Sequence, residues 1–270
     1  MMMPDKRDKN GLTEKEFLEN YTDTIYEKPS VTVDILVLSV DNNISKLKAL
    51  LVQRDEHPYL DQFALPGGFI RPDETAYQAA ARKLYEETGL KDIYLDQIYT
   101  FTKPGRDPRG WVMSIAYLAL IPEPIECKTG AKWFDLEIRQ GRIKLSNKAA
   151  FADITYGIKD ETFKNGKISY ENWVAGKVSE DGLSFDHIEI MIESILKLRS
   201  TFEHSDLAFN MAGETFTLPD LQALYELVLG RNLYKTNFRA MVSPKIEATG
   251  SKIKSRIKGK LSAEYRYIGQ

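Results

Sequence analysis

Apolar and polar positions along the chain follow two periods, and together these predict an α/β protein. The runs 31–40 and 47–54 are apolar and β-branched, with Asp-Asn-Asn between them as a turn signal, so they predict two paired strands. Further strands are expected over 62–68, 93–103, 111–121 and 131–138. Helices are expected over 13–21, from about Thr75 to Gly89, and over 186–202, 217–230 and 233–242.

The helix that ends at Gly89 has the clearest local signals. Asp73 or Thr75 supplies its N-cap, and Gly89 is the expected left-handed stop. Tyr77, Ala80, Ala81 and Leu84 have i, i+3, i+4, i+7 spacing and form the expected buried stripe.

Two later helices carry capping-box spacing at their starts. Asp186 with Glu189 begins one helix, and Thr217 with Asp220 begins the other. The first of these helices, to about residue 202, is expected to link two domains.

The expected organisation is an N-terminal extension (1–24), a larger domain (25–202) and a smaller C-terminal domain (203–270). Residues 147–182 resemble an insertion in the larger domain, with ITYGIK and KISYENWVAG as a hairpin. No chemistry follows from that hairpin.

Composition indicates a globular protein of the cytoplasm. Apolar residues make up 43% of the chain and charged residues 28%. The single cysteine, Cys127, excludes an intrachain disulfide framework. The first residues lack the apolar region of a secretory signal, and no run reaches the roughly 20 apolar residues of a membrane span. We therefore expect no membrane partner.

Charge is distributed unevenly, although the net charge is only −2. Residues 231–270 hold ten Lys or Arg and two Glu, a charge of +8, which leaves −10 on the rest of the chain. A basic terminus on an acidic body predicts a polyanionic partner. A solubilising tail is the alternative that composition also permits.

The stretch 67–90 has the elements of a metal–pyrophosphate site. Gly67 opens a loop that lets the backbone approach a phosphate closely. Lys83, Glu86 and Glu87 share one arc of the following helix, and carboxylates on one face are what a divalent metal needs.

The spacing in this stretch resembles the Nudix box. The resemblance rests on Gly68, Glu74, Arg82, Leu84, Glu86, Glu87, Gly89 and Leu90. It implies a Nudix α/β/α sandwich with a mixed sheet, Glu86 and Glu87 as catalytic and Mg²⁺-binding residues, and Glu74, Arg82 and Gly89 as structural residues. Active members carry a Glu where this chain has Lys83. A lysine cannot coordinate Mg²⁺, so we expect metal binding and hydrolysis to be weakened or lost; the alternative is that Lys83 points to solvent.

Other residues near the box suit an anionic effector. Arg54 and Arg71 flank it, and Arg106 and Arg109 lie in the polar loop GRDPRGW. A guanidinium grips two oxygens of a phosphate or ribose at once. With Gly68, these four arginines are the predicted effector-binding residues.

The C-terminal region has the order of a winged helix-turn-helix. Its second helix is the expected recognition helix and presents Asn232, Lys235, Thr236 and Arg239. Period two over 252–260 predicts a strand with all its cations on one face, followed by a returning strand at 264–268. The predicted wing contacts to a phosphate backbone are Lys252, Lys254, Arg256, Lys258 and Lys260. A charged edge hairpin that resists aggregation is the alternative.

A Nudix-like domain followed by a winged helix resembles the NrtR-type Nudix-related transcriptional regulators. The segments FDHIEIMIESILKLR, LAFNMAGETFTLPDLQALYELVLGR and KTNFR carry this resemblance. It implies a homodimer that binds a double-stranded DNA operator and senses ADP-ribose or a related NAD-derived nucleotide. A sugar effector such as arabinose is one alternative, and a Mg²⁺-dependent pyrophosphatase is another.

Overall fold

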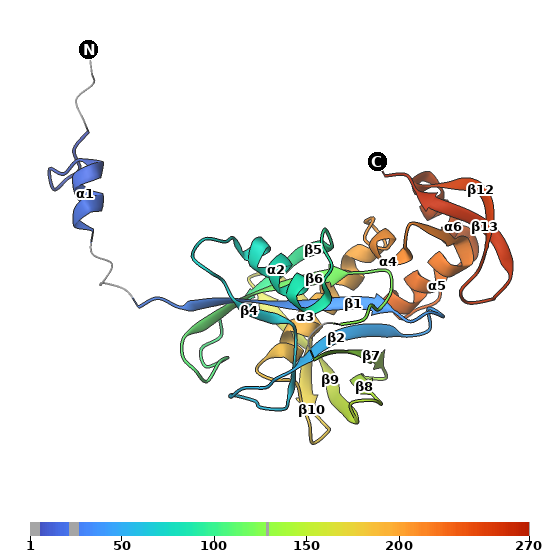
Figure 1. Ribbon diagram of the computed structural model, residues 1–270, viewed down its shortest axis with the longest axis horizontal. Coiled ribbons are helices and arrows are strands. Elements are labelled where there is room, and N and C mark those ends of the chain that lie inside the picture. The colour runs from blue at the N-terminus through green and yellow to red at the C-terminus, as the bar shows by residue number, and fades with distance from the viewer. Residues whose placement is uncertain (1–5, 22–26, 128–129, 270) are drawn as a thin grey trace, which may run out of the picture.

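A mixed sheet of ten strands organises most of the chain (Figure 1). The computed structural model describes residues 6–21, 27–127 and 130–269, so the expected boundary at residues 24 and 25 lies outside the described residues. The strands are β1 (Ser30–Val40), β2 (Leu47–Gln53), β3 (Phe63–Ala64), β4 (Gly67–Phe69), β5 (Tyr94–Phe101), β6 (Val112–Leu120), β7 (Ala131–Arg139), β8 (Arg142–Asn147), β9 (Ala152–Asn165) and β10 (Ile168–Lys177). They lie in the order β10-β9-β8-β7-β2-β1-β6-β5, with β3 on β2 and β4 on β1. The pair β1–β6 is parallel, whereas β1–β2 and β5–β6 are antiparallel.

Strand β1 shows why the sheet is covered on both faces. Successive side chains of a strand point to opposite faces. Val33, Ile35 and Val37 pack in a cluster with helix α2 (Ala76–Thr88), and Leu36 and Leu38 pack in the cluster that contains helix α3 (His187–Phe202). The expected α/β/α sandwich with a mixed sheet is therefore confirmed.

The buried face of α2 differs from the predicted stripe. Ala79, Ala80 and Leu84 are buried, but Tyr77 is 52% exposed, so its place in the stripe was wrong. The helix turns the smaller alanines to the sheet, which lets it lie close to β1.

The hairpin predicted within 147–182 is present as β9 and β10, paired from Tyr156–Lys177 to Asn165–Ile168. Strand β8, which was not predicted, joins this hairpin to β7, so the segment extends the main sheet. Its description as an insertion stays a prediction.

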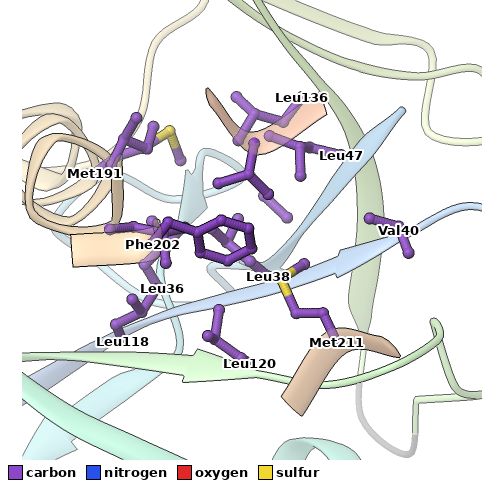
Figure 2. Close-up of a cluster of buried hydrophobic side chains, with 14 of the residues drawn as sticks. Leu36, Leu38, Val40, Leu47, Leu118, Leu120, Leu136, Met191, Phe202 and Met211 are labelled. Carbon is purple, nitrogen blue, oxygen red and sulfur yellow. The ribbon is translucent and has the colours of Figure 1, made fainter. Parts of the chain in front are cut away.

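The C-terminal part is a winged helix that packs directly on the sheet. It contains α4 (Phe209–Ala212), β11 (Thr215–Thr217), α5 (Leu218–Leu229), α6 (Lys235–Val242), η1 (Ser243–Lys245), β12 (Ile246–Lys254) and β13 (Leu261–Tyr267). Its three strands form a second sheet in the order β11-β13-β12. Figure 2 shows Phe202, at the end of α3, and Met211 of α4 in one cluster with Leu38 and Leu120 of the main sheet. One core thus continues across the expected domain boundary at residues 202 and 203, a boundary that stays a prediction.

Helix α1 (Glu14–Asn20) confirms the helix expected over 13–21 and has no buried residue. It lies apart from the rest of the chain in Figure 1. Within the described ranges, every helix falls short of the length and apolar character needed to cross a membrane.

Candidate functional site

Helix α2 is capped at both ends as its sequence predicts. The Thr75 hydroxyl accepts a hydrogen bond from the Gln78 backbone N–H at 3.2 Å, and the Gln78 side chain accepts one from the Thr75 N–H at 2.8 Å. Of the two predicted caps, Thr75 rather than Asp73 is therefore the one used. Gly89 ends the helix with φ 75°, a left-handed conformation that glycine adopts without strain.

Glu74 and Arg82 form the structural pair expected from the box. Arg82 donates from Nε to Oε2 of Glu74 at 2.9 Å and from Nη2 to Oε1 at 2.6 Å. The hydrogen bond from Arg82 lowers the pKa of Glu74 to about 2. Arg71, a predicted effector residue, is exposed on the preceding loop and donates its backbone N–H to Glu74 at 2.9 Å. Through Glu74, the loop that contains Arg71 is therefore joined to Arg82 on the helix that carries Glu86 and Glu87.

Lys83 lies across these carboxylates and not in solvent. Its Nζ is 2.8 Å from Oε2 of Glu86 and 4.0 Å from Oε1 of Glu87, and its side chain is only 20% exposed. Its methylenes lie beside Gly68, where an added Cβ would stand 3.3 Å from Cδ and Cε. The alternative of a solvent-directed lysine is therefore wrong. The Lys83 ammonium thus lies beside Glu86 and Glu87, where a bound metal ion would have to lie.

The arrangement around Glu86 does not fit Mg²⁺. Arg82 donates to Oε1 of Glu86 at 3.1 Å and Lys83 donates to Oε2, so both oxygens are engaged. Burial alone would raise the pKa of Glu86, but the hydrogen bonds from Lys83 and Arg82 outweigh it and lower the pKa. Across residues 6–21, 27–127 and 130–269, no group of three or more His, Cys, Asp or Glu is placed to hold a metal. Glu86 and Glu87 thus have the box positions without a metal site's donor set.

The backbone enters the site beside a buried carboxylate on β1. A Cβ on Gly67 would stand 2.3 Å from Oδ1 of Asp34 and 2.5 Å from the Val33 carbonyl, so only glycine fits there. The Ser114 hydroxyl donates to Oδ2 of Asp34 at 2.5 Å. Asp34 was not predicted as a site residue, although a single charge in the apolar run VTVDILVLSV was a signal for it.

Two of the four predicted effector arginines meet at one aromatic ring. The guanidinium carbon of Arg54 lies 5.0 Å from the ring centre of Phe185, and that of Arg109 lies 5.3 Å from the same ring. Arg109 also lies 5.2 Å from the ring centre of Phe69, which is 47% exposed. Arg109 also donates from Nη2 to Oδ2 of Asp107 at 2.6 Å, and Arg54 donates from Nε to the Pro58 carbonyl at 2.7 Å, so both guanidinium groups are held in place beside the rings. Phe185 and Phe69 were not predicted as site residues.

Arg106 is not available to an effector, which corrects the prediction for it. Its side chain is 4% exposed and donates from Nε and Nη2 to Asp186 at 2.8 and 2.6 Å. This pair also corrects the predicted capping box of α3, because Asp186 makes no side-chain cap and its carboxylate binds Arg106 instead. The loop 102–110 and the start of α3 are therefore held together by a buried ion pair.

His187 completes this buried polar cluster. Its Nδ1 accepts a hydrogen bond from the Leu65 backbone N–H at 2.9 Å, and its Nε2 lies 3.6 Å from Oδ1 of Asp34. Burial lowers the pKa of His187, although Asp34 acts in the opposite direction. A neutral ring is what the Leu65 contact requires.

The helix pair of the winged helix exposes most of its predicted DNA contacts. Phe238 and Val242 of α6 are buried, whereas Lys235, Thr236 and Arg239 are exposed. Asn232 is exposed too, but it lies in the turn before α6 and not on the helix as expected. The second predicted capping box is only half formed: the Thr217 hydroxyl accepts from the Asp220 N–H at 3.3 Å, while the Asp220 carboxylate accepts from the Thr217 hydroxyl at 2.8 Å instead of from its backbone N–H.

The wing differs from the strand predicted over 252–260, because β12 ends at Lys254. The Asp220 carboxylate accepts from the Ser255 hydroxyl at 2.7 Å and from the backbone N–H of Arg256 at 3.1 Å, which turns the chain there. Arg256 is half-buried and donates to the carbonyls of Asp41 and Asn42 at 3.0 and 3.1 Å. Its prediction as a DNA contact conflicts with this geometry. The other predicted wing cations, Lys252, Lys254, Lys258 and Lys260, are exposed.

Two protein families match separate parts of the chain. The NUDIX domain family matches residues 28–150, and the NrtR DNA-binding winged helix domain family matches residues 208–267. The "ADPR responsive transcriptional repressor NtrR" of Acinetobacter baylyi is 30% identical over 266 residues, which cover 97% of this chain and 91% of that protein.

Solved structures show the same likeness. A MutT/nudix family protein from Enterococcus faecalis is 29% identical with a TM-score of 0.77, over 95% of this chain and 94% of that one. NrtR from Shewanella oneidensis in complex with a 27mer DNA is 26% identical with a TM-score of 0.62, over 88% of this chain and 93% of that one.

Proposed function

We propose that this chain, which belongs to the family of NrtR-type Nudix-related transcriptional regulators, binds operator DNA and senses ADP-ribose or a related NAD-derived nucleotide. The observation that carries the proposal is the match along 97% of the chain to a relative named as an ADPR responsive repressor. The protein acts in the cytoplasm as a homodimer, because paired winged helices suit an operator with two half-sites.

The pocket of the Nudix-like domain senses its ligand and does not hydrolyse it. Lys83 and Arg82 engage both oxygens of Glu86, which removes a carboxylate that Mg²⁺ would need. The exposed side of the Arg54–Phe185–Arg109 stack suits a diphosphate joined to an aromatic base, since guanidinium groups bind phosphate and the rings can stack on the base.

Two elements connect this pocket to the winged helix. Helix α3 begins beside Phe185 and ends at Phe202, whose ring lies 5.0 Å from that of Tyr225 in α5. Arg199 of α3 also donates to the Val228 carbonyl of α5 at 2.9 Å. A ligand that displaces Phe185 therefore moves the start of a helix whose end is packed on the DNA-binding domain.

Strand β1 is the second connection. Asp34 lies on β1 at the pocket, 3.7 Å from Arg106, and the turn after β1 receives the Arg256 side chain of the wing. Ile44 in that turn is 8% exposed and belongs to the core shared with the winged helix. Arg106 joins α3 to the β1 side of the pocket. We therefore expect effector binding to shift α3 relative to β1. Such a shift changes the position of the winged helix and so its affinity for DNA.

The experiment that tests this function is selection of bound fragments from sheared genomic DNA, with and without ADP-ribose. Enrichment of a palindromic site that changes with ADP-ribose is the expected result. Enrichment that ignores ADP-ribose would keep the regulator and point to a sugar effector. Absence of any enrichment would overturn the DNA-binding function and favour a pyrophosphatase.

A further inference from the structure

Tyr234 is displayed to solvent directly before the recognition helix. It is the N-cap residue of α6, makes no side-chain cap bond, and is 82% exposed. An isolated exposed aromatic residue is ordinary on a protein surface and by itself indicates nothing. Tyr234 differs from such a residue because the backbone directly before it is held by side chains of α5.

That backbone is held in place on both sides of the preceding residue. The Leu233 N–H donates to Oε1 of Glu226 at 2.9 Å, and Nε2 of Gln222 donates to the Leu233 carbonyl at 3.0 Å. Gln222 also donates to Glu226 at 2.9 Å, so the two side chains of α5 form one clamp. The backbone before Tyr234 is thus fixed on α5, whereas the Tyr234 ring itself is mostly exposed and lies outside the core.

We propose that Tyr234 is a specificity-determining residue whose ring packs against a thymine methyl group in the major groove of the operator. The inference rests on the proposed DNA-binding function. In a helix-turn-helix protein, residues at the N-terminus of the recognition helix contact base edges. The thymine methyl is the apolar group that base pairs display in that groove, and an aromatic ring is a suitable partner for it.

The neighbouring residues of α6 have a different task. Lys235 and Arg239 are exposed cations, and their charge adds to the affinity for any duplex, whatever its sequence. Tyr234 carries no charge, so it discriminates between sequences without contributing to the release of counterions. The salt dependence of DNA affinity therefore distinguishes the loss of Tyr234 from the loss of a lysine.

The test measures the affinity of the full chain for a selected operator and for a scrambled duplex over a series of salt concentrations. Tyr234→Ala is expected to lower operator affinity about tenfold, leave scrambled-duplex affinity unchanged and keep the salt slope. Tyr234→Phe, which retains the ring, is expected to bind as the wild type does. Tyr99→Ala is the matched control, since it removes a ring that is 60% exposed on β5 of the Nudix-like domain.

Replacing each operator thymine in turn by deoxyuridine locates the contact. At one position the wild type loses affinity and Tyr234→Ala does not. A Tyr234→Ala variant with undiminished preference for the operator would overturn the role of Tyr234 alone, as would a Tyr234→Phe variant that is equally impaired. A wild-type protein that binds operator and scrambled duplex alike would overturn the proposed function together with this role.

Discussion

The side chain of Arg106 donates two hydrogen bonds to the carboxylate of Asp186, although 80 positions separate them in the chain. Both side chains are less than a tenth exposed, at 4% and 9%. The pair joins the loop before β6 to the first turn of α3, so it fixes the helix that leads from the pocket to the winged helix. Removing either partner would leave the other as a charge in a water-poor site.

Asp186→Asn should lower the free energy of unfolding by about 3 kcal/mol, because an uncompensated buried guanidinium is costly. Asp34 remains 3.7 Å from Arg106 and offsets only part of this loss. Urea denaturation measures the change. Arg71→Ala is the control, since that exposed arginine should change stability by less than about 0.5 kcal/mol. Equal stability of Asp186→Asn and the wild type would contradict the role given to the pair.

The buried ring of His187 should make stability depend on pH. Burial lowers its pKa in the folded state, so the unfolded chain takes up the proton first as the pH falls. The contribution of His187 to the free energy of unfolding is therefore fully present above the ordinary histidine pKa. Below that pKa the free energy of unfolding decreases, by at most about 1.4 kcal/mol per pH unit.

Urea denaturation at pH 7.5, 6.5 and 5.5 measures this slope for the wild type and for His187→Asn. The variant should have a shallower slope, since an amide does not titrate. The exposed His204 supplies the control His204→Asn, whose slope should match that of the wild type. Identical slopes for the wild type and His187→Asn would show that His187 is not the group responsible.

Lys83→Glu should restore metal binding and produce Mg²⁺-dependent hydrolysis of ADP-ribose. The substitution removes the ammonium 2.8 Å from Glu86 and places a third carboxylate beside Glu86 and Glu87. Calorimetric titration with Mg²⁺ and release of AMP measure the two effects. Lys83→Gln is the control, because it removes the charge without adding a ligand. Equal turnover in the wild type and Lys83→Glu would show that this lysine does not suppress the reaction.

The local part of this structure could be predicted from the sequence, because the interactions that make it span few residues. Lys83 and Glu86 are three positions apart on a helix, so their contact follows from helix geometry alone. The same holds for Thr75 and Gly89 at the ends of α2. The apolar, β-branched run 31–40 likewise predicted a strand, which is present as β1.

Two of the wrong predictions, the wing strand and the capping box of α3, depend on contacts between distant segments. A strand over 252–260 was expected from its period, but the Asp220 carboxylate captures the Ser255 hydroxyl and the Arg256 N–H and ends the strand at Lys254. Asp186 has the spacing of a capping residue, yet Arg106 offers its carboxylate a stronger, charged partner. Local spacing cannot reveal such a competing partner.

Arg256 and Lys254 provide the clearest test of the two uses of basic residues in the wing. Lys254 is exposed at the end of β12, whereas Arg256 reaches the carbonyls of Asp41 and Asn42 after β1. Lys254→Ala should lower affinity for any duplex and reduce the slope of log K against log salt by about one. Arg256→Ala should keep that slope and instead weaken the change in operator affinity caused by ADP-ribose, because it releases the wing from β1.

Salt titrations of both variants, with and without ADP-ribose, measure these effects on the same operator. A slope reduced equally by Arg256→Ala and Lys254→Ala would mean that the arginine leaves the turn and binds phosphate when DNA is present. An undiminished response to ADP-ribose in Arg256→Ala would leave α3 as the only one of the two connections that transmits the signal. The expected pair of results, a changed slope in one variant and a changed effector response in the other, would assign neighbouring cations of one hairpin to DNA binding and to interdomain coupling.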